Sequence, residues 1–249
     1  MDLNGKVAIV TGGSGVLGGL ICHTLAKAGC NVAVLYNHNR TRGETISEKL
    51  AEIGVDSEPM HCDVTDTDQV QSTVSSVLDR FGRVDILIND AAYNKWIAFD
   101  DIDGLTFDYW NKIISVNLTG PMNTIKAVIK PMKNQGTGRI VNISSIAGLS
   151  PTGSSIPYAV SKAGLNHLTK CMAVGLAPTI LVNSIAPGYL EGTKMSLSLT
   201  PEYRKNAVKE AILRRATDKD DVADQVVSFC KTDSITGQTL AIDSGRVFH

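Results

Sequence analysis

The sequence predicts an α/β fold in which a seven-stranded, doubly wound parallel sheet carries helices on both faces. Short runs rich in β-branched residues alternate with amphipathic segments of helix length, which is typical of successive β-α-β units. Most of these runs are continuously apolar, as strands buried on both faces should be. Strands are expected at residues 7–10, 32–36, 57–61, 86–88, 139–143, 180–185 and 239–242.

Helices are expected between these strands, at residues 19–29, 41–53, 66–81, 107–133, 157–175 and 219–230. Pro121 is expected to interrupt the helix at 107–133 near Gly120, because a proline ring disrupts a helix interior. A chain of 249 residues can bury a sizeable core as one α/β unit, so residues 1–249 are expected to form a single domain.

Composition argues for small-molecule chemistry. The formal net charge of −1 provides no electrostatic footprint for nucleic acid or for an anionic membrane. The five cysteines are scattered without C-x-x-C spacing and the five histidines form no ligand cluster, so neither a disulfide nor a metal site is expected. The first strand begins too early for a signal peptide, and no apolar run approaches the roughly 20 residues of a membrane span. A cytoplasmic location is therefore expected.

A glycine-rich turn follows the first strand. Gly13, Gly15 and Gly18 satisfy G-x-G-x-x-G, in which glycines let the backbone approach a pyrophosphate and let the helix pack closely on the strand. A plain turn before any α/β helix is the alternative. The strand before it and the helix after it favour the dinucleotide-binding unit of a Rossmann fold.

Tyr158 and Lys162 lie one helical turn apart and share a helix face. A tyrosine with a pKa of about 10 needs a fixed cation to stabilise its phenolate, and Lys162 is placed to supply it. A chance pair on a solvated helix is the alternative for any isolated Y-x-x-x-K. Here the glycine motif precedes it, which favours a catalytic pair.

These motifs, with Asn117 and with Ser145 thirteen residues before Tyr158, resemble the short-chain dehydrogenase/reductase family over about residues 5–245. The resemblance implies a NAD(P)(H)-dependent oxidoreductase with Asn117, Ser145, Tyr158 and Lys162 as catalytic residues. Tyr158 would exchange the proton, Ser145 would bind the carbonyl oxygen, and Asn117 would hold a water that relays protons to Lys162. Ser144 is the rival candidate for the role of Ser145. The alternative to a catalytic role for a serine at the end of a strand is a hydrogen bond within the turn or a helix N-cap.

The resemblance also implies a cofactor site. Asp63 and Val64 resemble the family's pair that contacts the adenine, although Asp63 could equally hydrogen-bond within the turn before the next helix. Thr193 resembles the residue that binds the nicotinamide carboxamide. The expected cofactor-binding residues are Gly12, Ser14, Gly15, Val16, Leu17, Gly18, Asn37, Arg40, Asp63, Val64, Asn89, Ala91, Tyr158, Lys162, Pro187, Gly188 and Thr193.

The end of the second strand predicts the choice of cofactor. A carboxylate that would bind the ribose hydroxyls of NAD is missing there, and the next acid is Glu44. Arg40 and Arg42 could pair with a 2′-phosphate while Asn37 supplies a neutral donor. NADP(H) is therefore predicted, with NAD(H) retained as the alternative.

The chain departs from the family pattern after the fourth strand. It reads Asn89-Asp90-Ala91-Ala92, where the family usually has Asn-Asn-Ala-Gly. Asp90 replaces an amide with an acceptor, and Ala92 adds a Cβ near the expected cofactor. Both changes are expected to reshape the cofactor pocket slightly.

Substrate choice is expected to depend on residues 93–99 and 151–156 and on a lid at about 189–213. The expected substrate-binding residues are Ser145, Tyr158, Trp96, Ile156 and Tyr189. A small apolar ketone or alcohol is predicted, because these segments could line a hydrophobic cavity with Trp96, Ile97, Phe99, Ile156, Tyr189 and Leu190. Packing of the lid onto the body is the alternative role for the apolar residues.

Two other functions are kept open. The overall pattern is most similar to 3-oxoacyl-acyl-carrier-protein reductases, and Lys126, Lys130 and Lys133 recur at helical spacing as a stripe that could dock an acidic carrier or could be a solvated face. A non-catalytic NADP-binding sensor or scaffold is the alternative of another class. The resemblance also implies a homodimer or homotetramer built on the helices at 107–133 and 157–175.

Overall fold

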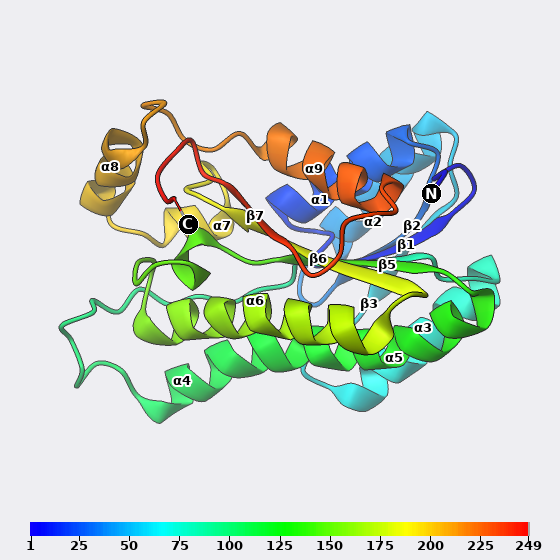
Figure 1. Cartoon of the computed structure of the whole chain (residues 1–249), viewed down its shortest axis with the longest axis horizontal. Coiled ribbons are helices and arrows are strands. Elements are labelled where there is room, and N and C mark those ends of the chain that lie inside the picture. Colours follow the sequence, from blue (N-terminus) through cyan, green and yellow to red (C-terminus); the bar gives the residue numbers. More distant parts are fainter. Residues whose placement is uncertain (249) are drawn as a thin grey trace.

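The computed structural model describes residues 1–248 and contains the predicted parallel sheet (Figure 1). Its strand order is β3-β2-β1-β4-β5-β6-β7. The order reverses between β1 and β4, and ligands of such folds bind beyond the carboxyl ends of the strands at this point. The strands are β1 (Val7–Thr11), β2 (Asn31–Tyr36), β3 (Ser57–His61), β4 (Ile86–Asn89), β5 (Gly138–Ile143), β6 (Ile180–Pro187) and β7 (Thr239–Ile242).

Helices cover both faces of the sheet, as Figure 1 shows. One face carries α1 (Val16–Lys27), α2 (Arg40–Ile53) and α9 (Lys219–Lys231), and the other carries α3 (Thr67–Phe81), α5 (Gly120–Gln135) and α6 (Ile156–Leu176). The short helices α7 (Lys194–Leu197) and α8 (Pro201–Glu210) follow β6. Within residues 1–248, none of the helices has the length and apolar character needed to cross a membrane.

The core has two parts because alternate strand residues point to opposite faces. Ala8 and Val10 of β1 join the cluster that contains Ile21 of α1, whereas Val7 and Ile9 join the cluster on the other face. All five side chains are at most 1 % exposed. Full burial of such a side chain contributes about 1.5–3 kcal/mol, so the sheet is held by both layers.

The helix predicted at residues 107–133 is interrupted next to Pro121, as expected, but by a change of helical type and not by a break in the chain of turns. The helix α4 (Phe107–Ile114) passes through a π-helical turn, Ser115–Thr119, directly into α5. Gly120 is helical, with φ −56° and ψ −53°, and Pro121 lies in the first turn of α5. Proline is tolerated there because it lies in the first turn of α5, where the π turn has already changed the hydrogen-bond pattern and the Gly120 N–H donates to the carbonyl of Ser115.

Asp85 joins the amino ends of three strands. Its carboxylate is fully buried, accepts the backbone N–H of Val7 at 2.9 Å, and pairs with the guanidinium of Arg83 at 2.6 and 2.7 Å. Its own backbone N–H donates to Val7 and its carbonyl accepts from the N–H of Arg139, both at 2.9 Å. Through its side chain and its backbone together, this one residue therefore fixes β1, β4 and β5 relative to one another.

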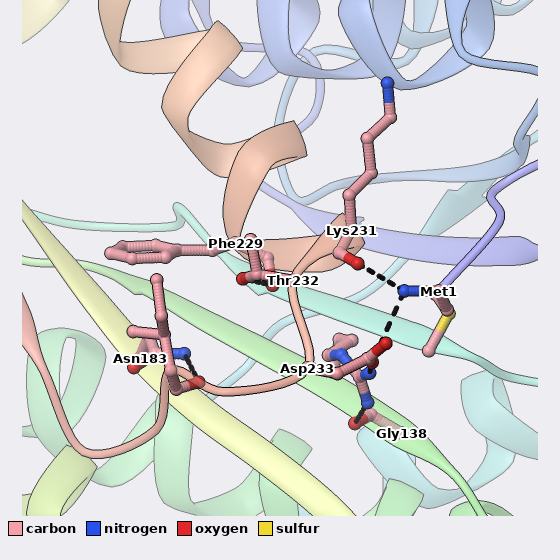
Figure 2. Close-up of polar contacts among 9 residues, drawn as sticks. Met1, Gly138, Asn183, Phe229, Lys231, Thr232 and Asp233 are labelled. Atoms are coloured by element: carbon pink, nitrogen blue, oxygen red, sulfur yellow. Dashed lines mark hydrogen bonds and ion pairs between the residues drawn. The ribbon is translucent and has the colours of Figure 1, made fainter.

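The start of the chain is held by the segment that links α9 to β7 (Figure 2). The amino group of Met1 donates to the carbonyl of Lys231 and lies 3.4 Å from the carboxylate of Asp233. Asp233 also accepts from Arg139, whose side chain is only 6 % exposed. Asn183 of β6 donates to a backbone carbonyl of the same segment at 2.7 Å. These contacts hold the segment against β5 and β6.

Candidate active site

A cleft of about 1040 Å³ opens at the carboxyl ends of the central strands. Its walls come from the loops after β1, β2, β3, β4 and β5, from the first turns of α1 and α6, and from the segment between β6 and α8. The cleft therefore lies where the reversed strand order predicts a ligand.

The loop between β1 and α1 exposes bare backbone to this cleft. Gly12 has a φ of +67°, and a Cβ on it would lie 2.9 Å from the backbone nitrogen of Ala91. A Cβ on Gly18 would collide with the carbonyl of Gly12. The N-cap of α1, Gly15, offers no side-chain cap. Free amides at a helix N-terminus bind phosphate, so the residues present fit a dinucleotide pyrophosphate.

Tyr158 and Ser145 meet within the cleft. Tyr158 lies in the first turn of α6 and Ser145 follows β5; both line the cleft, and the hydroxyl of Ser145 lowers the pKa of the phenol. Ser144 also lines the cleft, but its hydroxyl is already engaged, because it donates to the carbonyl of Lys162 at 3.1 Å. Neighbouring residues of an extended segment point to opposite sides, so only one of the two serines can face Tyr158.

Lys162 is a buried cation beside this pair. Its side chain is 3 % exposed, and its Nζ donates to the carbonyl of Ile143 at 2.8 Å and lies 5.8 Å from the ring centre of Tyr158. Burial lowers the pKa of Lys162 to about 8, while the nearby carboxylate of Asp90 acts in the opposite direction. The lysine is therefore poised to change charge close to the physiological range.

The phenol of Tyr158 is held in its protonated form in the free protein. Burial raises its pKa to about 12; the hydrogen bond from Ser145 lowers it, and Tyr203 and Asp90 raise it further. A protonated phenol is the form that can donate to a carbonyl oxygen.

Asn117 fixes one wall of the cleft from the π-helical turn. Its Oδ1 accepts the backbone N–H of Tyr93 at 2.7 Å, and its Nδ2 donates to the carbonyl of Tyr93 at 2.9 Å and to Ser161 Oγ at 3.1 Å. Asn117 is fully buried and does not line the cleft. The structure thus brings it under the site, and the water relay through it stays a prediction.

The two arginines at the start of α2 have different surroundings. Arg42 lines the cleft together with Asn37, whereas Arg40 pairs with Glu44 at 2.8 Å on an exposed surface. Asp63 also lines the cleft, and its carboxylate accepts from the N–H and the hydroxyl of Thr65 at 2.9 and 2.7 Å. The turn role considered for Asp63 is therefore observed, and its contact with a cofactor stays a prediction.

Most residues expected at the cofactor line one continuous cleft. Gly18 and Asn89 do not line the cleft. The side chain of Asn89 is engaged away from it, where it donates to Asn142 at 2.9 Å and accepts from Thr124 at 2.7 Å. The residues that line the cleft are Gly12, Ser14, Gly15, Val16, Leu17, Asn37, Asp63, Val64, Ala91, Tyr158, Lys162, Pro187, Gly188 and Thr193.

Only some of the expected substrate-binding residues line the cleft. Ser145, Tyr158 and Tyr189 line the cleft, but Trp96 and Ile156 do not. The ring of Trp96 instead packs edge-on against Tyr203 of α8, with ring centres 5.4 Å apart. Direct contacts of Trp96 and Ile156 with a substrate remain predictions.

Several residues that line the cleft are not in the expected site, and three of them carry polar or charged groups that matter here. Tyr203 lies in the predicted lid, so its position along the chain was a signal, although the residue itself was not singled out. Arg246 lies over the ring of Tyr203 at 5.6 Å and pairs with Glu210, and no local motif indicates it. Asp90 was noted only as a departure from a family pattern.

The fold and this cleft define a class of protein: an oxidoreductase that uses a nicotinamide dinucleotide. The family model described as short chain dehydrogenase matches residues 6–204. A curated relative from Staphylococcus aureus, named 3-oxoacyl-acyl-carrier-protein reductase FabG, is 33% identical over 248 residues, covering 96% of this chain and 97% of the relative.

Two solved structures are also similar to this chain. NAD+-bound xylitol dehydrogenase has a TM-score of 0.90 and 31% identity, with 98% of this chain and 100% of that chain covered. A variant of actinorhodin polyketide ketoreductase with NADPH has a TM-score of 0.89 and 30% identity, with 97% of each chain covered. The chain belongs to the short-chain dehydrogenase family and is an NAD(P)-dependent oxidoreductase.

Proposed function

We propose that this enzyme transfers a hydride reversibly between NADP(H) and the carbonyl or secondary alcohol carbon of a small apolar substrate. The observation that carries the proposal is the meeting of Tyr158, Ser145 and Lys162 in the same cleft as the glycine loop. The cofactor supplies the hydride when it is bound. The protein has to position the substrate and move the proton.

The side chains divide that work. In reduction, the protonated phenol of Tyr158 donates to the oxygen of the forming alkoxide, and Ser145 Oγ donates to the same oxygen. In oxidation, Tyr158 removes the alcohol proton, and the charged Lys162 stabilises the phenolate. The buried position of Lys162 strengthens this effect, because a low-dielectric surrounding weakens electrostatic interactions less than water does.

The wall formed after β6 favours an apolar substrate. The apolar part of this wall consists of Tyr189, Leu190, Met195, Leu197, Leu199 and Tyr203. Pockets of this kind bury most of a small ligand and orient it with a few polar groups, here Ser145 and Tyr158. We assign residues 189–213 as a lid over the substrate, since α7 and α8 contribute side chains to the cleft and bury only Ser196 and Ala207, respectively.

A 3-oxoacyl thioester on a carrier protein is the second candidate substrate. The similarity to FabG supports it, and Lys126, Lys130 and Lys133 are all exposed on α5, so they are free to meet an acidic partner. The same exposure fits a solvated helix face. The ratio of kcat/KM for the carrier-bound thioester and for a free ketone distinguishes the two substrates.

The experiment that tests the function is oxidation of NADPH, and separately of NADH, with cyclic and aryl ketones, diketones, sugars and a 3-oxoacyl thioester. We expect turnover in the parent and a kcat lower by at least about 100-fold in Tyr158→Phe, because general acid catalysis contributes that much. Tyr109→Phe is the matched control, since Tyr109 lies on α4 and does not line the cleft. It should retain the activity of the parent.

Cofactor binding, followed by fluorescence, separates loss of chemistry from loss of fold. Tyr158→Phe should still bind the dinucleotide. Equal activity of Tyr158→Phe and the parent would contradict the assignment of the acid/base group. Cofactor binding without turnover of any carbonyl, or of any alcohol in the reverse direction, would favour a sensor or scaffold.

A further inference from the structure

The carboxylate of Asp90 lies against the glycine loop, where the cofactor's phosphates are expected. Asp90 follows β4, and its backbone N–H donates to Thr11 Oγ1 at 3.1 Å, which fixes it beside the end of β1. Its Oδ2 is 2.9 Å from the position of a Cβ on Gly18 and 3.9 Å from that of a Cβ on Gly15. Asp90 also lines the cleft. An anion of the protein therefore stands beside the loop that should receive an anionic ligand.

This carboxylate lies beside one amide of the anion site. Gly18 is in the first turn of α1, and its backbone N–H lowers the pKa of Asp90. Amides of a first helical turn have no partner within the helix, and they are the donors that bind phosphate. In the free protein, Asp90 thus supplies a negative charge beside the amides that the phosphates of the dinucleotide contact when it binds.

The ionisable groups around Asp90 are few. Helix α6 contributes Lys162 and Tyr158, helix α1 contributes Cys22, and β1 contributes only the hydroxyl of Thr11. Lys162 is the one cation among these groups. Burial raises the pKa of Asp90 to about 7, and Lys162 and the Gly18 N–H oppose that shift.

We propose that Asp90 is a proton-binding residue of the dinucleotide site, which takes up a proton when the cofactor's phosphates enter the glycine loop. The proposal rests on the dinucleotide site described above. Its reason is electrostatic: two anions close together in a cleft disfavour the ionised carboxylate. Cofactor affinity should then decrease as the pH rises.

The direction in which cofactor affinity changes with pH follows from the coupling of proton binding to cofactor binding. With its pKa raised to about 7, Asp90 is partly ionised in the free protein near pH 7; the bound phosphates raise that pKa further, so the complex binds more protons than the free protein. Between the two pKa values the dissociation constant should increase by up to about tenfold per pH unit. At lower pH the carboxyl is neutral in both states, and the affinity should become independent of pH.

The test is calorimetric titration of the parent and of Asp90→Asn with NADH and with NADPH at pH 7, in two buffers of different ionisation enthalpy. We expect the parent to take up about half a proton and the variant almost none. NADH is included because it carries the pyrophosphate without the 2′-phosphate, whose own pKa is about 6. Asparagine has nearly the same shape and can still accept the Gly18 N–H, so the loop should keep its structure.

Asp224→Asn is the matched control, because Asp224 is exposed on α9 outside the cleft. It should take up the same proton as the parent. Binding of the dinucleotides with equal heats in both buffers would overturn the proposal. Uptake that persists in Asp90→Asn would also overturn it and would assign the proton to Lys162. Failure of the parent to bind either dinucleotide would overturn the cofactor site itself, which is a distinguishable result.

Discussion

At the scale of residues, the orientation of a side chain decides which of two neighbouring candidates takes part in the site. Arg40 and Arg42 are two positions apart at the start of α2, yet only Arg42 lines the cleft. The side chain of Arg40 is 77 % exposed and is engaged by Glu44. Ser144 and Ser145 both line the cleft, but the hydroxyl of Ser144 donates to the carbonyl of Lys162, and Ser145 is the serine that lowers the pKa of Tyr158. Sequence motifs locate such pairs within a residue or two, and the local backbone then selects one member.

Arg42→Ala should weaken binding of NADPH and leave binding of NADH nearly unchanged. A hydrogen-bonded charge pair with a 2′-phosphate contributes about 1.5–3 kcal/mol, which corresponds to a loss of roughly 10- to 100-fold in affinity. Fluorescence titration with each cofactor measures this. Arg40→Ala is the matched control and should bind NADPH within about twofold of the parent, since its side chain lies outside the cleft. Tighter binding of NADH than of NADPH by the parent would show the predicted preference to be wrong.

At the scale of elements, irregular positions place functional groups. The π-helical turn Ser115–Thr119 contains Asn117, whose amide holds both backbone groups of Tyr93 on the loop after β4. A proline at the next turn indicated an irregular helix, but its exact position depends on the hydrogen-bond ladder of the folded helix. The opposite ends of the strands are fixed by Asp85, far from the chemistry.

Asp85→Ala should lower the free energy of unfolding by about 2–3 kcal/mol, because the substitution leaves the buried N–H of Val7 without this acceptor and Arg83 without its partner. Urea denaturation measures the change. Asp56→Ala is the matched control: the Asp56 side chain is 60 % exposed and pairs with Arg80 at 3.0 Å, so its removal should cost less than about 1 kcal/mol. Equal losses in the two variants would show that burial of Asp85 is not the cause.

At the scale of the whole molecule, the strand order brings distant segments to one cleft and leaves apolar side chains exposed on the helices at one face. Val174 of α6 is 84 % exposed, and Phe107 at the start of α4 is 82 % exposed. Both lie on the helices through which a dimer or tetramer is expected. Apolar side chains this exposed on a folded protein are candidates for an interface.

Val174→Lys should shift the protein toward smaller assemblies, because a charged side chain would have to be desolvated where an apolar one was buried. Size-exclusion chromatography with light scattering measures the molar mass of each form. Ile102→Lys is the matched control, since Ile102 is 62 % exposed but lies in the loop before α4. A monomeric parent would show that the expected oligomer is wrong.

The sequence by itself determined the alternation of strands and helices, the glycine loop, and the spacing of Ser145, Tyr158 and Lys162, because these depend on local periodicity and short-range geometry. Only the tertiary structure decided which side chains share the cleft. Arg246 and Tyr203 meet there from separate elements, and Asp90 lies against α1 because β4 ends beside β1. The physical reason is that contacts and burial between distant segments, and the pKa shifts they cause, arise only after the sheet has brought those segments together.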